Sequence, residues 1–476
     1  MTSDAAADYD VIVIGGGPAG ENAAAYAIAG TERTAAIVER ELVGGECSYW
    51  ACMPSKALLR PAHVLSGAKA MAGIAASGLD VDAVLKRRDA FTHKHDDRSQ
   101  VDWAANTGID VVRGTGRLAG ERLVEVGGRL LRARHAVVLA TGTKAAVPDI
   151  PGLRDALPWI SRDATNLHEV PRRVVIIGGG VVACEAATWL AALGASEITM
   201  LVRGDALLGN AEPFARERVT AALSAAGVQI RFGTQPTRVE RAEAKDTGEG
   251  WIHGGAVTVR IGETEIEADE ILVAAGRGPA TAELGLDAVG LADGYVEVDD
   301  RLTVLGIDGE WLYAVGDVNH RAALTHMGKY QARVCGDVIA ARAEGRALSD
   351  VRYAATADHG QVPQVVFTAP EVASVGLTEA AARKAGYPVE TVEIDIAVAG
   401  SSLARDDYSG RAKIVIDTAT DTLLGATFVG PEVGELLHAA TVAVVGKVPL
   451  ATLWHAVPAY PTVSELWLRL LEARRS

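Results

Sequence analysis

The stretch YDVIVIGGGPAGENAA (residues 9–24) joins a short apolar run to clustered glycines and then to an alanine-rich segment. The run Val11–Ile14 has no polar alternation, which is typical of a strand buried on both faces of a parallel sheet. Gly15, Gly17 and Gly20 follow the pattern Gly-x-Gly-x-x-Gly, which favours a tight turn into a helix whose N-terminus faces a pyrophosphate. The stretch therefore predicts a strand, a turn and a helix that bind a dinucleotide.

The same arrangement recurs at residues 172–187, RRVVIIGGGVVACEAA, about one domain length further along the chain. Alanine-rich stretches that we expect to be helical, Ala19–Ala29 and Val181–Leu193, follow the two glycine turns. The duplication predicts an α/β fold with two Rossmann-like dinucleotide-binding domains. The second turn carries Gly178, Gly180 and Ala183, and further expected strands lie in HAVVLATGT (135–143), EILVAAGRGP (270–279) and WLYAVGDVNH (311–320).

Beyond about Leu348 the sequence changes character, because expected strands and helices are segregated there instead of alternating. This predicts a separate α+β domain that begins within the polar stretch AEGRALSDVRY (343–353). The expected strands are 364–367, 389–396, 412–416 and 425–429, and the expected helices are 378–385 and 434–445.

Composition excludes several classes of protein. The chain has 476 residues and a net charge of -15, which opposes the broad basic surface that nucleic-acid binding needs. No apolar run approaches the roughly 18 residues that span a bilayer. We therefore expect a cytoplasmic protein with neither a nucleic-acid nor a membrane partner.

The residues that follow each glycine turn distinguish the two nucleotides. Glu39 lies 19 residues after Gly20, where a carboxylate accepts hydrogen bonds from ribose hydroxyls. The matching strand end of the second turn carries Arg203 instead of an acid, which favours the 2'-phosphate of NADPH over NADH. Two nucleotides on one chain suggest a flavin dinucleotide at the first site and a nicotinamide at the second.

Two of the four cysteines lie close together, in GGECSYWACMPSK (44–56). A chain of this length needs no structural disulfide, and the nearest further metal-ligand candidate, His63, has no second cysteine pair to join. Residues 53–65 favour a helix that would place the pair at its N-terminus, where a thiolate is stabilised, with Lys56 one turn further on. A redox couple of Cys47 and Cys52 is thus favoured over a structural staple or a metal site. Tyr49 and Trp50 between them are expected to restrict access to Cys47 or to form an aromatic wall.

In their order along the whole chain, these motifs resemble the class I pyridine nucleotide-disulfide oxidoreductases, which include lipoamide dehydrogenase, glutathione and mycothione reductases and mercuric reductase. The resemblance also rests on Ala140-Thr141-Gly142, on GRGP (276–279), on AVGD (314–317) and on VFTAPEVASVGLTE (366–379). It implies an FAD-binding domain (1–152 and 283–346) interrupted by an NAD(P)-binding domain (153–282). It further implies a C-terminal interface domain (347–476) that makes a homodimer.

The resemblance also implies roles for individual residues. Cys52 would lie nearest the flavin as a charge-transfer thiolate, and Cys47 would be the interchange sulfur that meets the substrate. Lys56 and Glu185 would pair beside the flavin and the nicotinamide, and Asp317 would hold the ribityl and pyrophosphate region. Further cofactor contacts would come from Gly45, Thr141, Gly142, Gly276, Arg277, Gly316, Thr325 and His326.

The chain departs from the family near its C-terminus. Members that reduce small disulfides carry His-Pro-Thr followed by Glu, whereas WHAVPAYPTVSELW (454–467) has Tyr460 in place of the histidine and keeps Glu465. Tyrosine has a pKa near 10 and is a poor base at neutral pH. His455 could serve only if the local backbone differs from that of the family.

The electron acceptor therefore stays open. Mercuric reductases are similar in having a tyrosine near this position, but their C-terminal vicinal cysteine pair is absent from LLEARRS (470–476). The main hypothesis is an NAD(P)H oxidoreductase with a redox-active Cys47–Cys52 disulfide that passes electrons through FAD to a disulfide or another acceptor. The alternatives are a metal-ion or quinone reductase, and a redox-sensing flavoprotein with negligible turnover.

Overall fold

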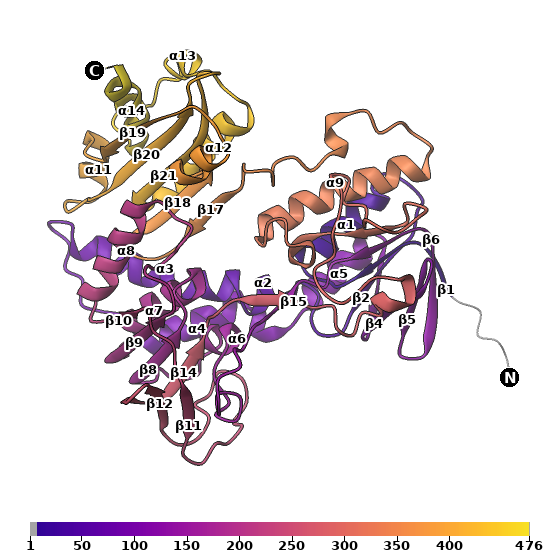
Figure 1. Cartoon of the computed structure of the whole chain (residues 1–476), viewed down its shortest axis with the longest axis horizontal. Coiled ribbons are helices and arrows are strands. Elements are labelled where there is room, and N and C mark those ends of the chain that lie inside the picture. Colours follow the sequence, from indigo (N-terminus) through magenta and orange to yellow (C-terminus); the bar gives the residue numbers. More distant parts are fainter. Residues whose placement is uncertain (1–6, 476) are drawn as a thin grey trace. The chain divides into compact units, whose positions relative to one another are not determined.

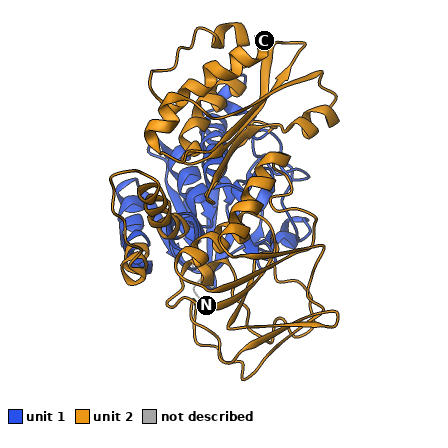
Figure 2. Ribbon diagram, turned by 90° about the vertical axis from the view of Figure 1, so that its left-hand side faces the viewer, with its two compact units in different colours: residues 1–54, 89–145, 277–358 blue, residues 55–88, 146–276, 359–476 orange. Residues whose placement is uncertain are grey.

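The computed structural model describes residues 7–475, which form two compact units coloured separately in Figure 2. Unit 1 comprises residues 1–54, 89–145 and 277–358, and unit 2 comprises residues 55–88, 146–276 and 359–476. The chain thus leaves unit 1 and returns to it twice. The finer boundaries expected at 152, 282 and 346 stay predictions, because unit 2 joins the second glycine turn and the C-terminal region in one body.

Unit 1 is built on a seven-stranded sheet in which β3, β2, β1, β6 and β16 are parallel neighbours and β5 and β4 continue the sheet antiparallel. The apolar runs at 11–14, 135–143 and 311–320 form β1, part of β6 and β16 of this sheet, as predicted. Val11 and Ile12 of β1 are fully buried. The strands are β1 (Ala7–Ile14), β2 (Ala35–Glu39), β3 (Ile109–Arg113), β4 (Gly116–Gly120), β5 (Leu123–Val126), β6 (Arg129–Leu139) and β16 (Leu312–Ala314).

Two long helices of unit 1, α1 (Pro18–Ile28) and α9 (Thr325–Ala343), pack against each other (Figure 1). Their backbones approach closely, since a Cβ on Gly336 would lie 2.5 Å from the Cβ of Tyr26. The rest of unit 1 contains α2 (Gly45–Tyr49), the first turn of α3 (Cys52–Lys69), α5 (Arg98–Asn106), the pair β7 (Thr143–Ala145) and β15 (Arg277–Pro279), and the 3-10 turns His93–His95, Leu286–Val289, Gly316–Asn319 and Val351–Tyr353.

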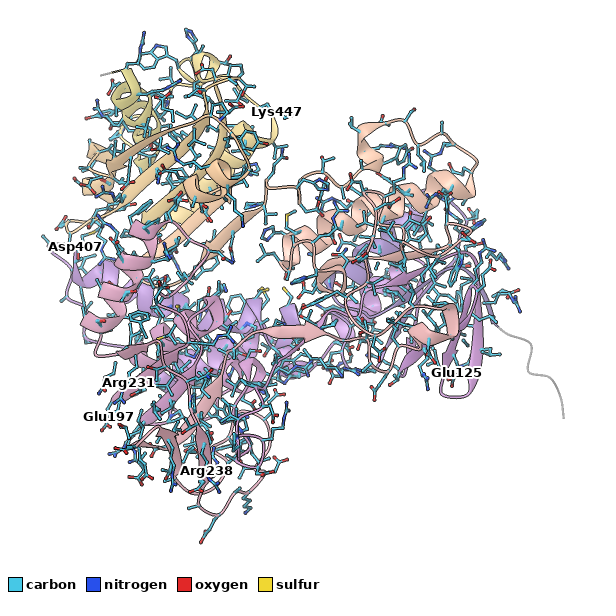
Figure 3. The ribbon with its side chains drawn as sticks, viewed as in Figure 1. Glu125, Glu197, Arg231, Arg238, Asp407 and Lys447 are labelled. Carbon is cyan, nitrogen blue, oxygen red and sulfur yellow. The ribbon has the colours of Figure 1, made fainter. Side chains whose placement is uncertain are left out.

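Unit 2 contains the second parallel sheet, whose strand order is β10, β9, β8 and β14. Helix α7 follows β8 across the second glycine turn, as predicted. The strands β11, β12 and β13 form an antiparallel sheet. Arg238, labelled in Figure 3, is the first residue of β11 and pairs with Glu240 on the same strand. The bounds are β8 (Arg173–Ile177), β9 (Glu197–Val202), β10 (Gln229–Phe232), β11 (Arg238–Arg241), β12 (Val257–Ile261), β13 (Thr264–Ala268), β14 (Glu270–Val273), α4 (Val81–Phe91), α6 (Ser161–Thr165), α7 (Val181–Ala192) and α8 (Pro213–Ala225).

The C-terminal part of unit 2 is a five-stranded antiparallel sheet in the order β17, β18, β21, β20 and β19. The predicted strands and helices of this region are present, whereas β18, α11, α13 and α14 were not predicted. The elements are β17 (Pro363–Val366), β18 (Glu371–Gly376), β19 (Val389–Asp395), β20 (Arg411–Asp417), β21 (Thr422–Gly430), α10 (Glu379–Lys384), α11 (Ala399–Ala404), α12 (Leu437–Val445), α13 (Leu450–Leu453), α14 (Leu466–Arg475) and the 3-10 turns Val433–Leu436 and Val463–Glu465. Among residues 7–475, no helix combines the length and the apolar character that crossing a bilayer requires.

Candidate active site

The first glycine turn leaves no room for side chains. A Cβ on Gly15 would lie 2.3 Å from the carbonyl oxygen of Ala140, and a Cβ on Gly20 would lie 1.9 Å from the carbonyl oxygen of Gly15. A Cβ on Gly45 would lie 2.7 Å from the Cα of Gly17, so the segment that leads into α2 rests on the start of α1. The turn thus exposes the N-terminus of α1 to a ligand while bringing the cysteine segment next to it.

Glu39 reaches this turn from the end of β2, as its spacing predicted. Its Oε2 accepts a hydrogen bond from the Gly16 backbone N–H at 2.6 Å. The hydroxyl of Thr141, at the end of β6, is buried without a hydrogen-bond partner among the described residues. A free helix N-terminus, a carboxylate and a buried unsatisfied hydroxyl fit a bound dinucleotide.

A chain of polar contacts in unit 1 connects Asp317 to the cysteine segment. Thr143 Oγ1 donates to Asp317 Oδ2 at 3.0 Å, Arg277 Nε donates to Thr143 Oγ1 at 2.6 Å, and Arg277 also pairs with Glu46. Burial raises the pKa of Asp317, against the hydrogen bond from Thr143 and the charge of Arg277, which lower it. This series of contacts holds Glu46, and therefore the neighbouring Cys47, at a fixed position relative to Asp317.

The two cysteines lie together where one short helix ends and a longer one begins. Cys47 is in α2, and Cys52 is the first residue of α3, as the sequence predicted. The structure contains no bond between the two sulfurs, and Cys52 Sγ lies 3.2 Å from Thr325 Oγ1 at the start of α9. The arrangement places two sulfurs and one hydroxyl in a single cluster of unit 1.

Cys47 departs from the expectation that its thiolate is favoured. A hydrogen bond with Cys52 is the largest influence and raises the pKa of Cys47, and burial raises it further. A hydrogen bond with Thr325 and the charge of Lys329 act in the opposite direction. The reason is that two adjacent sulfurs cannot both carry a charge readily, so a helix N-terminus alone does not decide their ionisation.

The linker between the cysteines forms no wall at a substrate entrance, which corrects the prediction made from its aromatic residues. Tyr49 is 1 % exposed and Trp50 is 8 % exposed. The Tyr49 hydroxyl donates to the Val43 carbonyl at 3.0 Å, and the Trp50 ring stacks on His95, with ring centroids 5.3 Å apart. His95 also lies 3.2 Å from the Tyr49 carbonyl oxygen through Nε2. These side chains point into unit 1 and fix the conformation of the linker.

In unit 2, Lys56 and Glu185 form the ion pair that the family resemblance implied, at 2.8 Å between Nζ and Oε2. The other oxygen of Glu185 accepts the Phe367 backbone N–H at 2.9 Å. Lys56 Nζ also lies 4.7 Å from the centroid of the Phe367 ring. Both oxygens of a buried carboxylate are therefore satisfied, which fixes its orientation.

The second glycine turn directly precedes Glu185, the acidic member of this pair, in the sequence. A Cβ on Gly178 would lie 2.2 Å from the Ala274 carbonyl oxygen, Gly180 caps α7 without steric restriction, and Ala183 is fully buried. Glu185 follows Ala183 on the same helix, so the carboxylate of the Lys56–Glu185 pair lies near the start of α7, whereas Lys56 lies on α3. Arg203 is exposed just after β9. Unit 2 thus has a dinucleotide-type turn with a fixed carboxylate close to it.

Comparisons with known proteins identify the family. Residues 9–337 match the model of the pyridine nucleotide-disulphide oxidoreductases, and residues 362–470 match the dimerisation domain of the same family. The chain belongs to the pyridine nucleotide-disulphide oxidoreductases. Members of this family are FAD-dependent and take electrons from NAD(P)H, so the protein is an FAD-dependent oxidoreductase that uses NAD(P)H. The dimerisation domain supports a homodimer.

Individual relatives differ in the acceptor that their names state. The chain is 34% identical to a dihydrolipoyl dehydrogenase of Thermus scotoductus, covering 98% of this chain and 97% of that protein. It is 30% identical to a mercuric reductase of Staphylococcus aureus, covering 96% of this chain and 81% of that protein. The HOCl-induced flavoprotein disulfide reductase RclA from Escherichia coli shares the fold, with a TM-score of 0.81, 25% identity and coverage of 98% and 99%.

The C-terminal segment in which this chain departs from the family pattern lies in unit 2. Tyr460 is 75% exposed, whereas Glu465 is buried and pairs with Arg469 at 2.6 Å. The second oxygen of Glu465 is buried without a partner, and no hydrogen bond joins Tyr460 to Glu465 within residues 7–475. His455 is also exposed. Glu465 therefore does not orient Tyr460 within one subunit, and the roles of Tyr460 and His455 stay predictions.

Replacing Tyr460 with histidine is expected to raise the turnover of a small disulfide about tenfold near pH 7, because histidine has a pKa near 6.5 and exchanges protons there. Steady-state assays of Tyr460→His beside Tyr460→Phe measure the effect. The phenylalanine variant should match the wild type. Equal rates in all three proteins would show that this position supplies no acid or base.

Sequence reasoning missed three residues of the site. Glu46 pairs with Arg277, which lies 231 residues away, and His95 packs on the linker from a turn whose residues 93–95 all have positive φ. Phe367 supplies both a backbone N–H and a ring to the Lys56–Glu185 pair. No spacing rule connects such distant residues, although the non-glycine positive φ values could have marked the turn before His95 as constrained.

Proposed function

We propose that the protein passes electrons from NAD(P)H, through FAD bound in unit 1, to a Cys47–Cys52 disulfide and from Cys47 to a disulfide substrate. The observation that carries the proposal is the cluster of two thiols and Thr325 beside the first glycine turn. FAD, when bound, would accept two electrons as a hydride from the nicotinamide and pass two electrons on to the disulfide.

The residues of this chain would then have separate tasks. Gly15, Gly17, Gly20 and Glu39 would bind and orient FAD, together with Gly45, Thr141, Gly142, Gly276, Arg277, Gly316, Asp317, Thr325 and His326. Gly178, Gly180, Ala183 and Arg203 would bind the nicotinamide nucleotide, and the Lys56–Glu185 pair would orient its ring. The domain boundaries at 152, 282 and 346 belong to the same proposal.

Cys52 would be the sulfur on the flavin side, and Cys47 the one that meets the acceptor. The hydroxyl of Thr325, 3.2 Å from Cys52 Sγ, would stabilise whichever sulfur carries the charge. Cys184 and Cys335 are fully buried in α7 and α9, where burial raises the pKa of each thiol, so neither is suited to exchange.

A soft metal ion is the second candidate acceptor. Two adjacent reduced thiols are the ligand type that soft metal ions prefer. Several of the similar proteins are named mercuric reductases, which adds support. Under this proposal the ion would be a substrate held between Cys47 and Cys52. It would bind there without help from a C-terminal vicinal cysteine pair of the kind found in mercuric reductases.

An acceptor comparison tests the proposal. Purified protein would be assayed with NADPH and with NADH against small disulfides, quinones and Hg²⁺. We expect the highest kcat/KM with a disulfide and a preference for NADPH through Arg203. Fast turnover of Hg²⁺ alone would favour the second candidate, and turnover restricted to quinones would contradict a role for Cys47. Flavin that neither nicotinamide bleaches would overturn the proposal.

A further inference from the structure

The linker between the two cysteines is held by one neighbouring segment of unit 1, residues 93–100. The Trp50 ring stacks on the His95 ring, with centroids 5.3 Å apart and planes 22° apart. His95 Nε2 lies 3.2 Å from the carbonyl oxygen of Tyr49. From the same segment, Gln100 Oε1 accepts a hydrogen bond from the Tyr49 hydroxyl at 3.2 Å. One imidazole therefore contacts two consecutive residues of the linker.

The segment also fixes the chain just before the first cysteine. Asp97 Oδ2 accepts a hydrogen bond from the Val43 backbone N–H at 2.8 Å, and both residues are buried. The Val43 carbonyl oxygen in turn accepts the Tyr49 hydroxyl at 3.0 Å. Residues 43–50 are thus attached at both ends to residues 95–100 without a bond between the sulfurs.

The backbone that presents His95 is strained. His93, Lys94 and His95 have φ values of 49°, 52° and 59°, in the left-handed region that residues other than glycine rarely adopt. Such conformations persist only where surrounding contacts hold them, and they collect at functional sites. The His95 N–H closes the turn by donating to the Thr92 carbonyl at 2.9 Å. This strained turn places the imidazole of His95 against the linker.

We propose that His95 and the contacts around it hold the linker between Cys47 and Cys52 closed and thereby shift the equilibrium of the pair toward the disulfide. A disulfide needs two sulfurs close together, and a linker that is already closed gives each thiol a high effective concentration at the other. His95 is a positioning residue, because it acts through Tyr49 and Trp50. The inference rests on the proposed function, in which the cysteine pair is redox-active.

This equilibrium sets how strongly the reduced pair drives the acceptor. A linker held closed favours the return to the disulfide, so the reduced pair gives up its two electrons to the acceptor more readily. Loosening the linker should have opposite effects on the two half-reactions. The pair would be reduced more completely, and it would be a weaker reductant of the acceptor.

The test measures the equilibrium between dithiol and disulfide in the full-length, FAD-containing protein. The protein is equilibrated anaerobically with mixtures of reduced and oxidised dithiothreitol, quenched in acid and alkylated, and modified Cys47 and Cys52 are counted by mass spectrometry. In this exchange the Cys47–Cys52 bond breaks, dithiothreitol becomes its cyclic disulfide, and two electrons with two protons pass to the cysteines. We expect His95→Ala to shift the midpoint about tenfold toward the dithiol, which corresponds to about 30 mV.

Two milder variants separate positioning from a simple loss of stability. His95→Phe keeps a ring on Trp50 and loses the contact with the Tyr49 carbonyl, so its midpoint should lie between those of His95→Ala and the wild type. Tyr49→Phe removes only a hydroxyl and should shift the midpoint about threefold in the same direction. A merely structural role would lower the resistance to urea without this graded change in the midpoint. If His95→Ala does not fold, the two milder variants supply the comparison.

His168→Ala is the matched control, because the His168 ring stacks on Trp251 in unit 2, with centroids 4.5 Å apart and planes 17° apart. It should leave the midpoint unchanged. Wild-type midpoints in the His95 and Tyr49 variants, or midpoints shifted toward the disulfide, would overturn the inference. A wild-type protein whose Cys47 and Cys52 form no disulfide in any mixture would instead contradict the proposed function, so the two failures are distinguishable.

Discussion

Cys47→Ser is expected to reduce the turnover of a small disulfide by roughly 1,000-fold or more, because in the proposed function Cys47 is the sulfur that forms the mixed disulfide with the acceptor. The loss should fall on kcat with either nicotinamide. Reduction of the flavin by NADPH should persist, since the contacts of Lys56 and Glu185 in unit 2 are untouched. Anaerobic stopped-flow and steady-state assays measure the two steps separately.

Cys335→Ala is the matched control, because Cys335 is fully buried in α9, and its replacement by another small side chain leaves the cluster intact. It should retain wild-type turnover. Disulfide turnover that is unchanged in Cys47→Ser would show that Cys47 is not the interchange sulfur. Quinone reduction should survive in Cys47→Ser, because that reaction needs only the flavin.

Lys56→Met is expected to slow the reduction of the flavin by NADPH about 10- to 100-fold, because Glu185 loses the cation that orients its carboxylate near the second glycine turn. The Glu185 side chain is 5% exposed and would keep only the Phe367 N–H as partner. Leaving a buried carboxylate half satisfied should also lower the free energy of unfolding by about 1 to 3 kcal/mol.

Two measurements separate these effects: the rate of flavin bleaching under anaerobic mixing and urea unfolding monitored by circular dichroism. Lys69→Met is a matched control at the last residue of the same helix. It should change neither quantity. A Lys56→Met variant that bleaches at the wild-type rate, whatever its stability, would remove Lys56 from the hydride-transfer step.

Local sequence predicted the parts of the fold that depend on neighbouring residues. The apolar runs that end in glycine became the parallel strands β1, β6, β8 and β14, because only strands buried on both faces tolerate such runs. Gly15 and Gly20 were predicted from the spacing of the glycine motif. That spacing is reliable because a Cβ at either position would overlap backbone atoms. The position of Glu39 at the first glycine turn could be predicted because its distance in sequence from Gly20 is fixed within one βαβ unit.

Contacts between distant segments could not be predicted in this way. The Lys56–Glu185 pair was expected only through the resemblance to a family, since 129 residues separate its members. The burial of Tyr49 and Trp50 depends on Val43 and on His95, which reaches them from another turn. The raised pKa of Cys47 depends on the distance between two sulfurs, which a spacing of residues does not give.

The central claim is that Cys47 and Cys52 form a second centre that accepts two electrons, in addition to FAD. Anaerobic titration of the full-length protein with NADPH tests it most directly, with absorbance and free thiols followed together. We expect the protein to take up two two-electron equivalents and to gain two reactive thiols. A long-wavelength absorbance band from a Cys52 thiolate beside the oxidised flavin should develop with the first equivalent and disappear as the second equivalent reduces the flavin. Uptake of one equivalent, with bleaching of the flavin and no new thiols, would contradict the claim.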